Sequence, residues 1–437
     1  MIRNCRKLLF NNNALSCLQK KSFLTNNYKC TEAWTSSNSS PIISKINLND
    51  FYNKIDQNHS SNGVISAIDV DLFANAIRDQ SHLEELKELL HKLRLSAETG
   101  QMLESTNYAT IRNYMELGNV EELVEILKDP LNFGVFLDSY TANMLLDNLL
   151  TTSNYELAAR VASLVMLQED FSNDITCTLC QYACYKYISN YTPPEPAPPE
   201  DNKNKKVEEI KIRIKYLRNP YFDDHFDIKE TITLSGKTLA WISERANDNL
   251  NKNLEIIGWL AFKKYDKLTQ VCQSAIKNES FKLYGEVLEQ LQKENETVNE
   301  ESKPIIENCI SILSNAQKSE GSMEKALENS IENAINRSQN EDVAQQQKLF
   351  KSWAQLREER LESQTQRLDR ARRVQIIQEK QKELHYEEQK LWFFDNEDKI
   401  DLQIEDKEKM VDEPTKQKVA KVDNEDYIPP EIVPKRR

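Results

Sequence analysis

Apolar residues recur three or four positions apart between Gly118 and Val161, which is the spacing of a buried helix face. The N-x-x-E pattern of Asn119 and Glu122 predicts a capped helix start, because the Asn side chain accepts from a free backbone N–H. Asn154 repeats this start 35 positions later, and Ser139 is placed to cap the helix between them. The pattern predicts helical hairpins that repeat every 35 residues.

A similar unit precedes this stretch. The letters "EEL" at Glu84–Leu86 recur at Glu121–Leu123, 37 residues further on, and a capping pattern begins at Ser81. A single hairpin cannot bury its own apolar face, so neighbouring hairpins must stack. We therefore expect an all-α helical-hairpin repeat solenoid, with three units between about residues 63 and 189 of a repeat region spanning 32–190. Further helices and one long C-terminal helix complete the expected fold.

A period of 35 is one residue longer than that of tetratricopeptide repeats, and it is typical of pentatricopeptide repeats. The stretch "GVFLDSYTANMLLDNLL" resembles the junction of two such repeats, where a first-helix Asn often meets an RNA base. Asn143 matches that position, on one face with Tyr140 and Asp147. Tyr108 could stack on a base and Arg112 could pair with a phosphate. We take Tyr108, Arg112 and Asn143 as RNA-binding candidates; the alternative for Asn143 is an ordinary solvated helix position.

The proline-rich stretch "YTPPEPAPPED" predicts a stiff linker over residues 191–206, which would close the repeat region. After it, Ile210, Ile212 and Ile214 alternate with basic residues, as in a short strand or an extended segment on a partner. This is the densest basic cluster before the C-terminal helix, and we expect it to contact phosphates; the alternative is a solvated strand face. Its cations are Lys203, Lys205, Lys206, Lys211, Arg213, Lys215 and Arg218.

The rest of the chain divides into four segments. Residues 207–300 predict the basic extended segment and a second helical region, and residues 301–342 are acidic and predicted to be partly mobile. No Gly or Pro interrupts residues 343–394, so about fifty residues at 1.5 Å each predict a helix on the order of 75 Å long. Residues 395–437 predict a charged, disordered tail. The long helix carries a cluster that could bind RNA or be merely solvated: Arg367, Arg370, Arg372 and Arg373.

Charge separates the beginning of the chain from its body. Residues 1–31 contain six cations, no carboxylate and a helix-like apolar face, which predicts a mitochondrial transit peptide; the alternative is a disordered basic tail. Without those cations the formal charge of −13 becomes −19. Such an acidic body is unlike a pure nucleic-acid clamp, so RNA must be contacted through local basic patches. No apolar run is long enough to cross a bilayer, and we expect no membrane partner.

Three short motifs suggest ligand chemistry but lack the partners that it needs. "LSGKTLA" has Thr231 where a phosphate-binding loop needs its first Gly, and Ser235 is more simply a helix cap. Cys177–Cys184 has no second cysteine pair for a metal and reads as buried cysteines on a helix face. Asn219–Asp227, "NPYFDDHFD", reads as a turn with capping Asp side chains. We therefore expect no enzymatic activity, no cofactor, no metal site and no small-molecule substrate.

Three stretches resemble one family: "FGVFLDSYTANMLLDNLLTTSNYELAARVASLVMLQED", "YLRNPYFDDHFD" and "LFKSWAQLREERLESQTQ". The chain is similar along most of its length to mitochondrial ribosomal small-subunit proteins with pentatricopeptide repeats, the family of protein twenty-seven of that subunit. The resemblance implies a non-catalytic structural subunit of the mitochondrial ribosome in the matrix. Its implied partners are the small-subunit rRNA and neighbouring mitochondrial ribosomal proteins.

Two other classes remain open on the sequence alone. A free pentatricopeptide factor for RNA processing or stability would favour more repeats and a basic concave face. A helical protein-binding adaptor would need no RNA contacts. The acidic net charge leads us to expect more protein contacts than RNA contacts.

Overall fold

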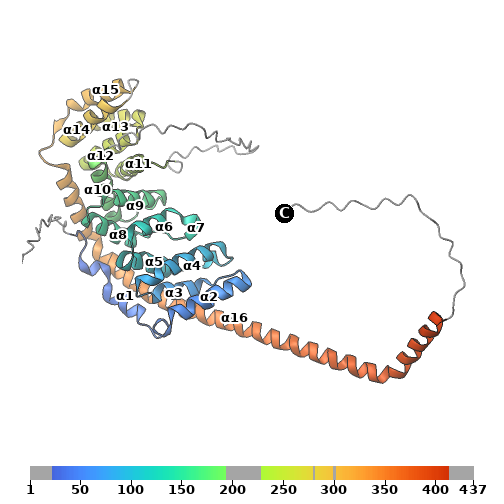
Figure 1. The fold of residues 1–437 in the computed structure, drawn as a ribbon. Helices are drawn as coiled ribbons and strands as arrows, with labels where there is room; N and C mark the ends of the chain where they lie inside the picture. Colours follow the sequence, from blue (N-terminus) through green and yellow to red (C-terminus); the bar gives the residue numbers. More distant parts are fainter. Residues whose placement is uncertain (1–21, 193–227, 279–280, 299–301, 413–437) are drawn as a thin grey trace, which may run out of the picture. The chain divides into compact units, whose positions relative to one another are not determined.

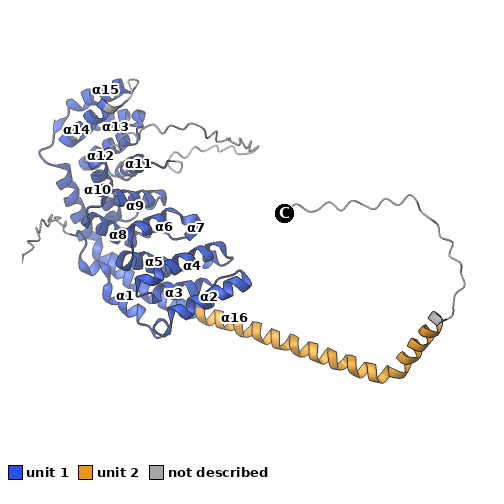
Figure 2. Cartoon of the chain, viewed as in Figure 1, with its two compact units in different colours: residues 1–360 blue, residues 361–437 orange. Residues whose placement is uncertain are grey.

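The computed structural model describes residues 22–192, 228–278, 281–298 and 302–412 of the 437-residue chain. It divides into two compact units, residues 1–360 and 361–437, with α16 (Met323–Asp412) running through the boundary (Figure 2). The described residues are almost entirely helical, as the sequence predicted, and the two strands have two residues each, β1 (Lys282–Leu283) and β2 (Gln317–Lys318), paired in parallel.

Six helical hairpins follow one another through unit 1 in sequence order (Figure 1). They are α3 (Ala67–Ala76) with α4 (Leu83–Leu95), α5 (Glu104–Leu117) with α6 (Val120–Lys128), α8 (Ser139–Thr151) with α9 (Tyr155–Leu167), α10 (Asp174–Asn190) with α11 (Thr231–Glu244), α12 (Asn249–Ala261) with α13 (Tyr265–Lys277), and α14 (Gly285–Thr297) with α15 (Lys303–Ser314). Short elements precede or join them: η1 (Asn26–Lys29), α1 (Thr31–Asn38), η2 (Ile43–Lys45), α2 (Leu48–Asn62), η3 (Gln80–His82), η4 (Thr99–Gln101) and α7 (Pro130–Phe133).

The 35-residue period of the sequence is present in the helices. The first helices α5, α8 and α10 begin at residues 104, 139 and 174, each 35 positions after the last. Asn119 and Asn154 both cap second helices by accepting a backbone N–H, as predicted. The cap predicted at Ser139 is wrong by one residue, because Asp138 accepts from the backbone of Thr141 and Ser139 is already helical.

The array does not stop at the proline-rich stretch. Helix α11 packs against α9, α10 and α12, so a hairpin closes across residues 193–227, which lie outside the described residues. A single hydrophobic core runs through unit 1 from Leu24 to Trp353. Leu145, in the stripe predicted to be shared between hairpins, is fully buried in it. The predicted linker is therefore an insertion within one compact unit.

The C-terminal segments also differ from the prediction. Most of the region expected to be partly mobile is helical, as α15 and the start of α16. The long helix was expected over residues 343–394, and it spans Met323–Asp412 instead. The extra turns at both ends contain neither Gly nor Pro, and their Glu, Lys and Gln residues are strong helix formers. Within the described residues, no helix is both long and apolar enough to cross a membrane.

The "LSGKTLA" motif is a packing motif of α11. Ser235 is not a cap; it lies inside the helix and donates to the carbonyl of Thr231 at 2.6 Å. A Cβ on Gly236 would lie 2.6 Å from the backbone N of Phe262, and one on Gly258 would lie 2.5 Å from the backbone N of Ala240. The two glycines therefore allow α11 and α12 to approach closely, which is why these small residues occur here.

The cysteines of "CTLCQYAC" lie on α10 as expected. Cys180 and Cys184 are fully buried and Cys177 is partly buried, and burial raises the pKa of all three thiols. Raised pKa values keep these side chains protonated and unreactive. The described residues contain no group of His, Cys, Asp and Glu side chains that could hold a metal ion. "NPYFDDHFD" lies outside the described residues.

Candidate RNA interface and the covered repeat face

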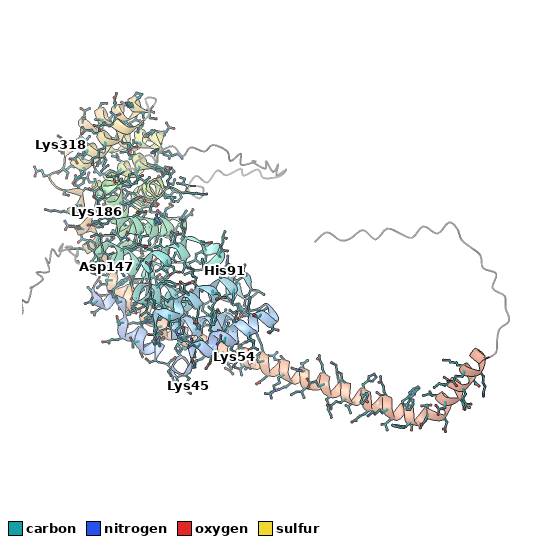
Figure 3. All side chains as sticks on the ribbon, in the orientation of Figure 1. Lys45, Lys54, His91, Asp147, Lys186 and Lys318 are labelled. Atoms are coloured by element: carbon teal, nitrogen blue, oxygen red, sulfur yellow. The ribbon has the colours of Figure 1, made fainter. Side chains whose placement is uncertain are left out.

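Three residues occupy equivalent positions on successive first helices. Arg112 on α5, Asp147 on α8 and Tyr182 on α10 are each 35 positions apart. All three contact residues 22–38, which we call the strap. Asp147 and Lys186 of these helices lie along one side of unit 1, and His91 of the second helix α4 lies along the other (Figure 3). The side formed by the first helices is where the sequence predicted RNA.

Asp147 holds the beginning of the strap. Its carboxylate accepts from the hydroxyl of Ser22 at 2.6 Å, from the backbone N–H of Phe23 at 2.8 Å and from that of Leu24 at 3.4 Å. The ring of Phe23 lies edge-on against Tyr182, with centroids 5.4 Å apart. Asp147 is only 4% exposed, so these three bonds satisfy a carboxylate that has little access to water.

Tyr28 lies at the centre of the strap and is completely buried. Its ring stacks on Tyr140 with centroids 4.6 Å apart, and the Tyr140 hydroxyl donates to the Tyr28 carbonyl. The Tyr28 hydroxyl accepts from Asn143 Nδ2 at 2.9 Å and donates to Asp342 of α16 at 3.0 Å. Burial raises the pKa of Tyr28, so its hydroxyl stays protonated and can donate. Tyr28 thus joins α8 to α16.

Arg112 holds the next part of the strap. Its guanidinium donates to the carbonyl of Lys29, to the Tyr108 hydroxyl at 2.8 Å and to Glu116 at 2.7 Å. It also lies over the ring of Trp34, 5.4 Å from the centroid. The arginine side chain is 2% exposed and its donors are directed at groups of its own chain. Such a cation is a structural anchor in this conformation.

The first part of α16, up to Arg360, runs beside the strap along the same first helices (Figure 1). Glu324 pairs with Lys186 of α10. Phe350 and Trp353 pack on Tyr108 of α5, with ring centroids 5.3 and 5.5 Å away. The cover reaches α3 at its far end, where Arg357 pairs with Asp71 at 2.7 Å. Both covering segments thus extend from α10 to the first hairpin.

Tyr108, Arg112 and Asn143, the three RNA-binding candidates of the repeat region, do not lie on an open surface. The first two are 2% exposed and Asn143 is fully buried, so the alternative of a solvated position also fails for Asn143. Their stacking and hydrogen-bonding groups face the strap and α16. An RNA base could reach them only if both segments left. The sequence does not reveal the strap, because Phe23 and Tyr28 fall within the predicted leader and the spacing of Phe23, Tyr28 and Trp34 forms no helical stripe.

Of the two other predicted RNA-binding patches, the structure describes only the arginines of the long helix. The cations from Lys203 to Arg218 lie outside the described residues. The four arginines of the long helix lie in unit 2, and every one is exposed: Arg367, Arg370, Arg372 and Arg373. The described part of the chain offers none of these four an ion-pair partner within 4.0 Å, although Asp369 lies among them. Their positive charge is therefore exposed and has no ion-pair partner in the described part of the chain.

Exposed apolar side chains follow these arginines along unit 2. Leu391, Trp392, Phe393 and Phe394 are consecutive and between 46% and 66% exposed, so the helix is apolar on every side at this point. A helix that is apolar all round is normally buried against a partner. Further exposed apolar side chains on this helix are Leu368, Val374, Ile376, Ile377, Leu384, Tyr386, Leu402 and Ile404.

Stacked hairpins with a 35-residue period, continued by a long exposed helix, place the chain among helical-repeat proteins. The family model of the mitochondrial 28S ribosomal protein S27 matches residues 1–383. The chain belongs to this family, which confirms the resemblance found in the sequence. It is a component of the small subunit of the mitochondrial ribosome, in the matrix. The matched range includes all four exposed arginines and ends before Leu391.

Proposed function

We propose that the protein is a non-catalytic structural subunit that binds small-subunit rRNA through Arg367–Arg373 of unit 2. The observation that carries this proposal is that four arginines of unit 2 are exposed and have no ion-pair partner in the described chain. In unit 1, by contrast, the repeat face is occupied by residues of the protein itself. Arginine is suited to phosphate because its planar guanidinium donates two parallel hydrogen bonds. The cations from Lys203 to Arg218 form a second proposed patch, on composition alone.

Neighbouring ribosomal proteins are the proposed partners of the apolar residues Leu391–Phe394. Their exposure supports this assignment, since a cluster of large apolar side chains is stabilised by burial at about 25 cal/mol per Å². The acidic segment around them repels phosphate: residues 395–408 carry Asp395, Glu397, Asp398, Asp401, Glu405, Asp406 and Glu408 against two lysines, Lys399 and Lys407. One helix would then contact RNA at its basic part and protein at its apolar part.

The proposal also includes a pentatricopeptide origin for the hairpins and a cleaved import leader. The 35-residue period supports the first, and the acid-free basic composition of the first 31 residues supports the second. A free pentatricopeptide RNA factor is disfavoured, because the face that would read RNA is occupied by the strap and α16.

Sedimentation of a mitochondrial lysate tests the proposal. The endogenous protein should migrate with the small subunit on a gradient, and RNase treatment should move it to lighter fractions. Ultraviolet crosslinking before digestion should attach rRNA fragments to peptides from residues 361–383. A protein that stays with the subunit but crosslinks only to proteins would support an adaptor. A protein that migrates free of the subunit would contradict the structural role.

A further inference from the structure

The strap lies close to the proposed import leader, and this constrains where the leader can end. The acid-free, basic composition of residues 1–31 predicts that the leader is cut between about residues 20 and 35. Ser22, at the beginning of the strap, already donates to Asp147, and Leu24, Tyr28, Cys30 and Trp34 are buried in the core of unit 1. We propose that processing in the matrix ends before Ser22, and that residues 22–38 are kept as an intrachain ligand of the repeat face.

Loss of the first strap residues would leave Asp147 without partners. Its three side-chain hydrogen bonds all come from Ser22, Phe23 and Leu24, and the carboxylate is 4% exposed. Their removal would exchange three hydrogen bonds to a charged acceptor, made where water has little access, for contacts with solvent, which is unfavourable. A cut beyond Leu24 therefore removes the ligand for which this position of the repeat is built.

A cut further along would open the core. Removal of Tyr28 would expose the ring of Tyr140 and leave Asn143 and Asp342 without the hydroxyl that joins them. Removal of Trp34 would uncover one side of Tyr108 and the guanidinium of Arg112. Every later cut thus exposes apolar rings or isolates a buried polar group on α5 or α8.

The distribution of charge gives an independent reason. Five of the six cations in the acid-free leader lie in residues 1–21, at Arg3, Arg6, Lys7, Lys20 and Lys21. The sixth is Lys29, which belongs to the strap: its carbonyl accepts from Arg112 and its side chain is exposed. Most of the positive charge of the leader therefore ends at Lys21, and the segment that packs on the repeat face begins at Ser22.

The inference rests on the proposed leader. One measurement distinguishes a wrong prediction of the leader from a wrong prediction of the retained strap. The protein is purified from mitochondria through a C-terminal tag, its α-amines are labelled before digestion, and the N-terminal peptide is identified by mass spectrometry. A first residue between 2 and 22 is expected. An intact Met1 would refute the leader, whereas a first residue beyond Ser22 would refute the retained strap.

A second measurement tests whether Asp147 holds the strap in the full chain. Asp147→Ala should make the backbone N–H groups of Phe23 and Leu24 exchange with solvent roughly tenfold faster or more, since the removal of hydrogen bonds to a charged group shifts a local opening by at least that factor. Asp174→Ala is the matched control, because Asp174 is a carboxylate on α10 that is 61% exposed. If these two N–H groups stay as protected in Asp147→Ala as in the parent, Asp147 does not hold the strap and the inference is overturned.

Discussion

Arg357 of α16 donates from Nε to Oδ2 of Asp71 on α3 at 2.7 Å, across 286 positions of the chain. Both side chains are buried, with 4% and 0% of their surface exposed. The other oxygen of Asp71 accepts from Thr106 at 3.0 Å and from Asn75 at 3.1 Å. The carboxylate is thus fully hydrogen-bonded, and one ion pair fixes the covering helix to the first hairpin.

We predict that Arg357→Met lowers the free energy of unfolding of the protein by about 3–5 kcal/mol, because it leaves the Asp71 carboxylate buried without its counter-charge. The double variant Asp71→Leu with Arg357→Met should recover part of that loss, since it removes both charges but leaves the hydroxyls of Ser105 and Thr106 without this acceptor. Guanidinium denaturation followed by circular dichroism measures both. Arg360→Ala is the control: Arg360 is exposed, and its replacement should change stability by less than about 0.5 kcal/mol. Equal losses for Arg357 and Arg360 would show that the pair contributes nothing specific.

The packing of α11 against α12 gives a second prediction. Gly258→Ala would place a Cβ 2.5 Å from the backbone N of Ala240, so the two helices must move apart. Overpacking of this kind costs about 1–3 kcal/mol, and the melting temperature should fall. Gly285→Ala provides the control, because nothing lies within 4 Å of the added methyl group. An unchanged melting temperature for Gly258→Ala would mean that the two backbones do not approach closely.

Local patterns in the sequence predicted the hairpins before residue 174: α3–α4, α5–α6 and α8–α9. Asn119 and Asn154 cap helices because the capping bond forms within three residues, and the apolar stripes follow from the helical period alone. The error at Ser139 has the same local origin: Asp138 and Ser139 are adjacent, and both side chains can cap. Such features depend on neighbouring residues, so one sequence suffices to find them.

The covered face could not be predicted in this way. Asn143 is hydrogen-bonded to Tyr28, 115 positions away in the sequence, and Asp71 to Arg357, 286 positions away. A periodic pattern in the sequence does not identify such distant pairs. The prediction that the proline-rich stretch closes the repeat region was wrong for a related reason. The composition of this stretch does not reveal that α10, before it, packs against α11, after it. Exposure of a helical face depends on every segment that packs there. The sequence predicted that Tyr140, Asn143 and Asp147 share one helical face, which they do, but it did not show that the strap occupies this face.

Leu145 tests the stacking of the hairpins. It is fully buried on α8, within the core shared by successive hairpins, so Leu145→Asp places a carboxylate where it has no partner. We expect a loss of several kcal/mol and a lower, broader thermal transition of the whole chain. Leu131→Asp is the matched control, because Leu131 is 78% exposed. Similar melting curves for the two variants would mean that the apolar face of α8 that contains Leu145 is exposed to solvent.

The apolar part of unit 2 makes a prediction about protein partners. Replacing Trp392, Phe393 and Phe394 with Ser should weaken incorporation into the small subunit and remove chemical crosslinks between this helix and neighbouring proteins, because the exposed rings are proposed to be buried there. Crosslinks from rRNA to residues 361–383 should persist in the fraction that still incorporates. Unchanged protein crosslinks would show that the rings are not part of an interface.

The exposed arginines of unit 2 are predicted to let an acidic protein bind RNA. A chain with a formal charge of −13 repels phosphate at long range, so attraction must come from cations concentrated at short range. Arg370, Arg372 and Arg373 are exposed, and each one brought to a phosphate releases counterions. Their joint replacement with Gln should therefore weaken binding to rRNA, flatten its dependence on salt and reduce incorporation into the small subunit. Gln is a good helix former, so circular dichroism should stay unchanged.

A control on the same helix separates this local effect from a change in net charge. Replacing Lys399, Lys407 and Lys409 with Gln also removes three exposed cations, but these lie among the acidic residues of unit 2, where phosphate is already repelled. Tagged variants are followed on gradients, and rRNA crosslinks are quantified at several salt concentrations. If only the arginine variant crosslinks less, with a salt slope smaller by about 0.9 for each phosphate that is no longer neutralised, the arginines bind phosphate. If both variants crosslink less to the same extent, net charge governs binding, and if neither changes, the arginines are solvated surface.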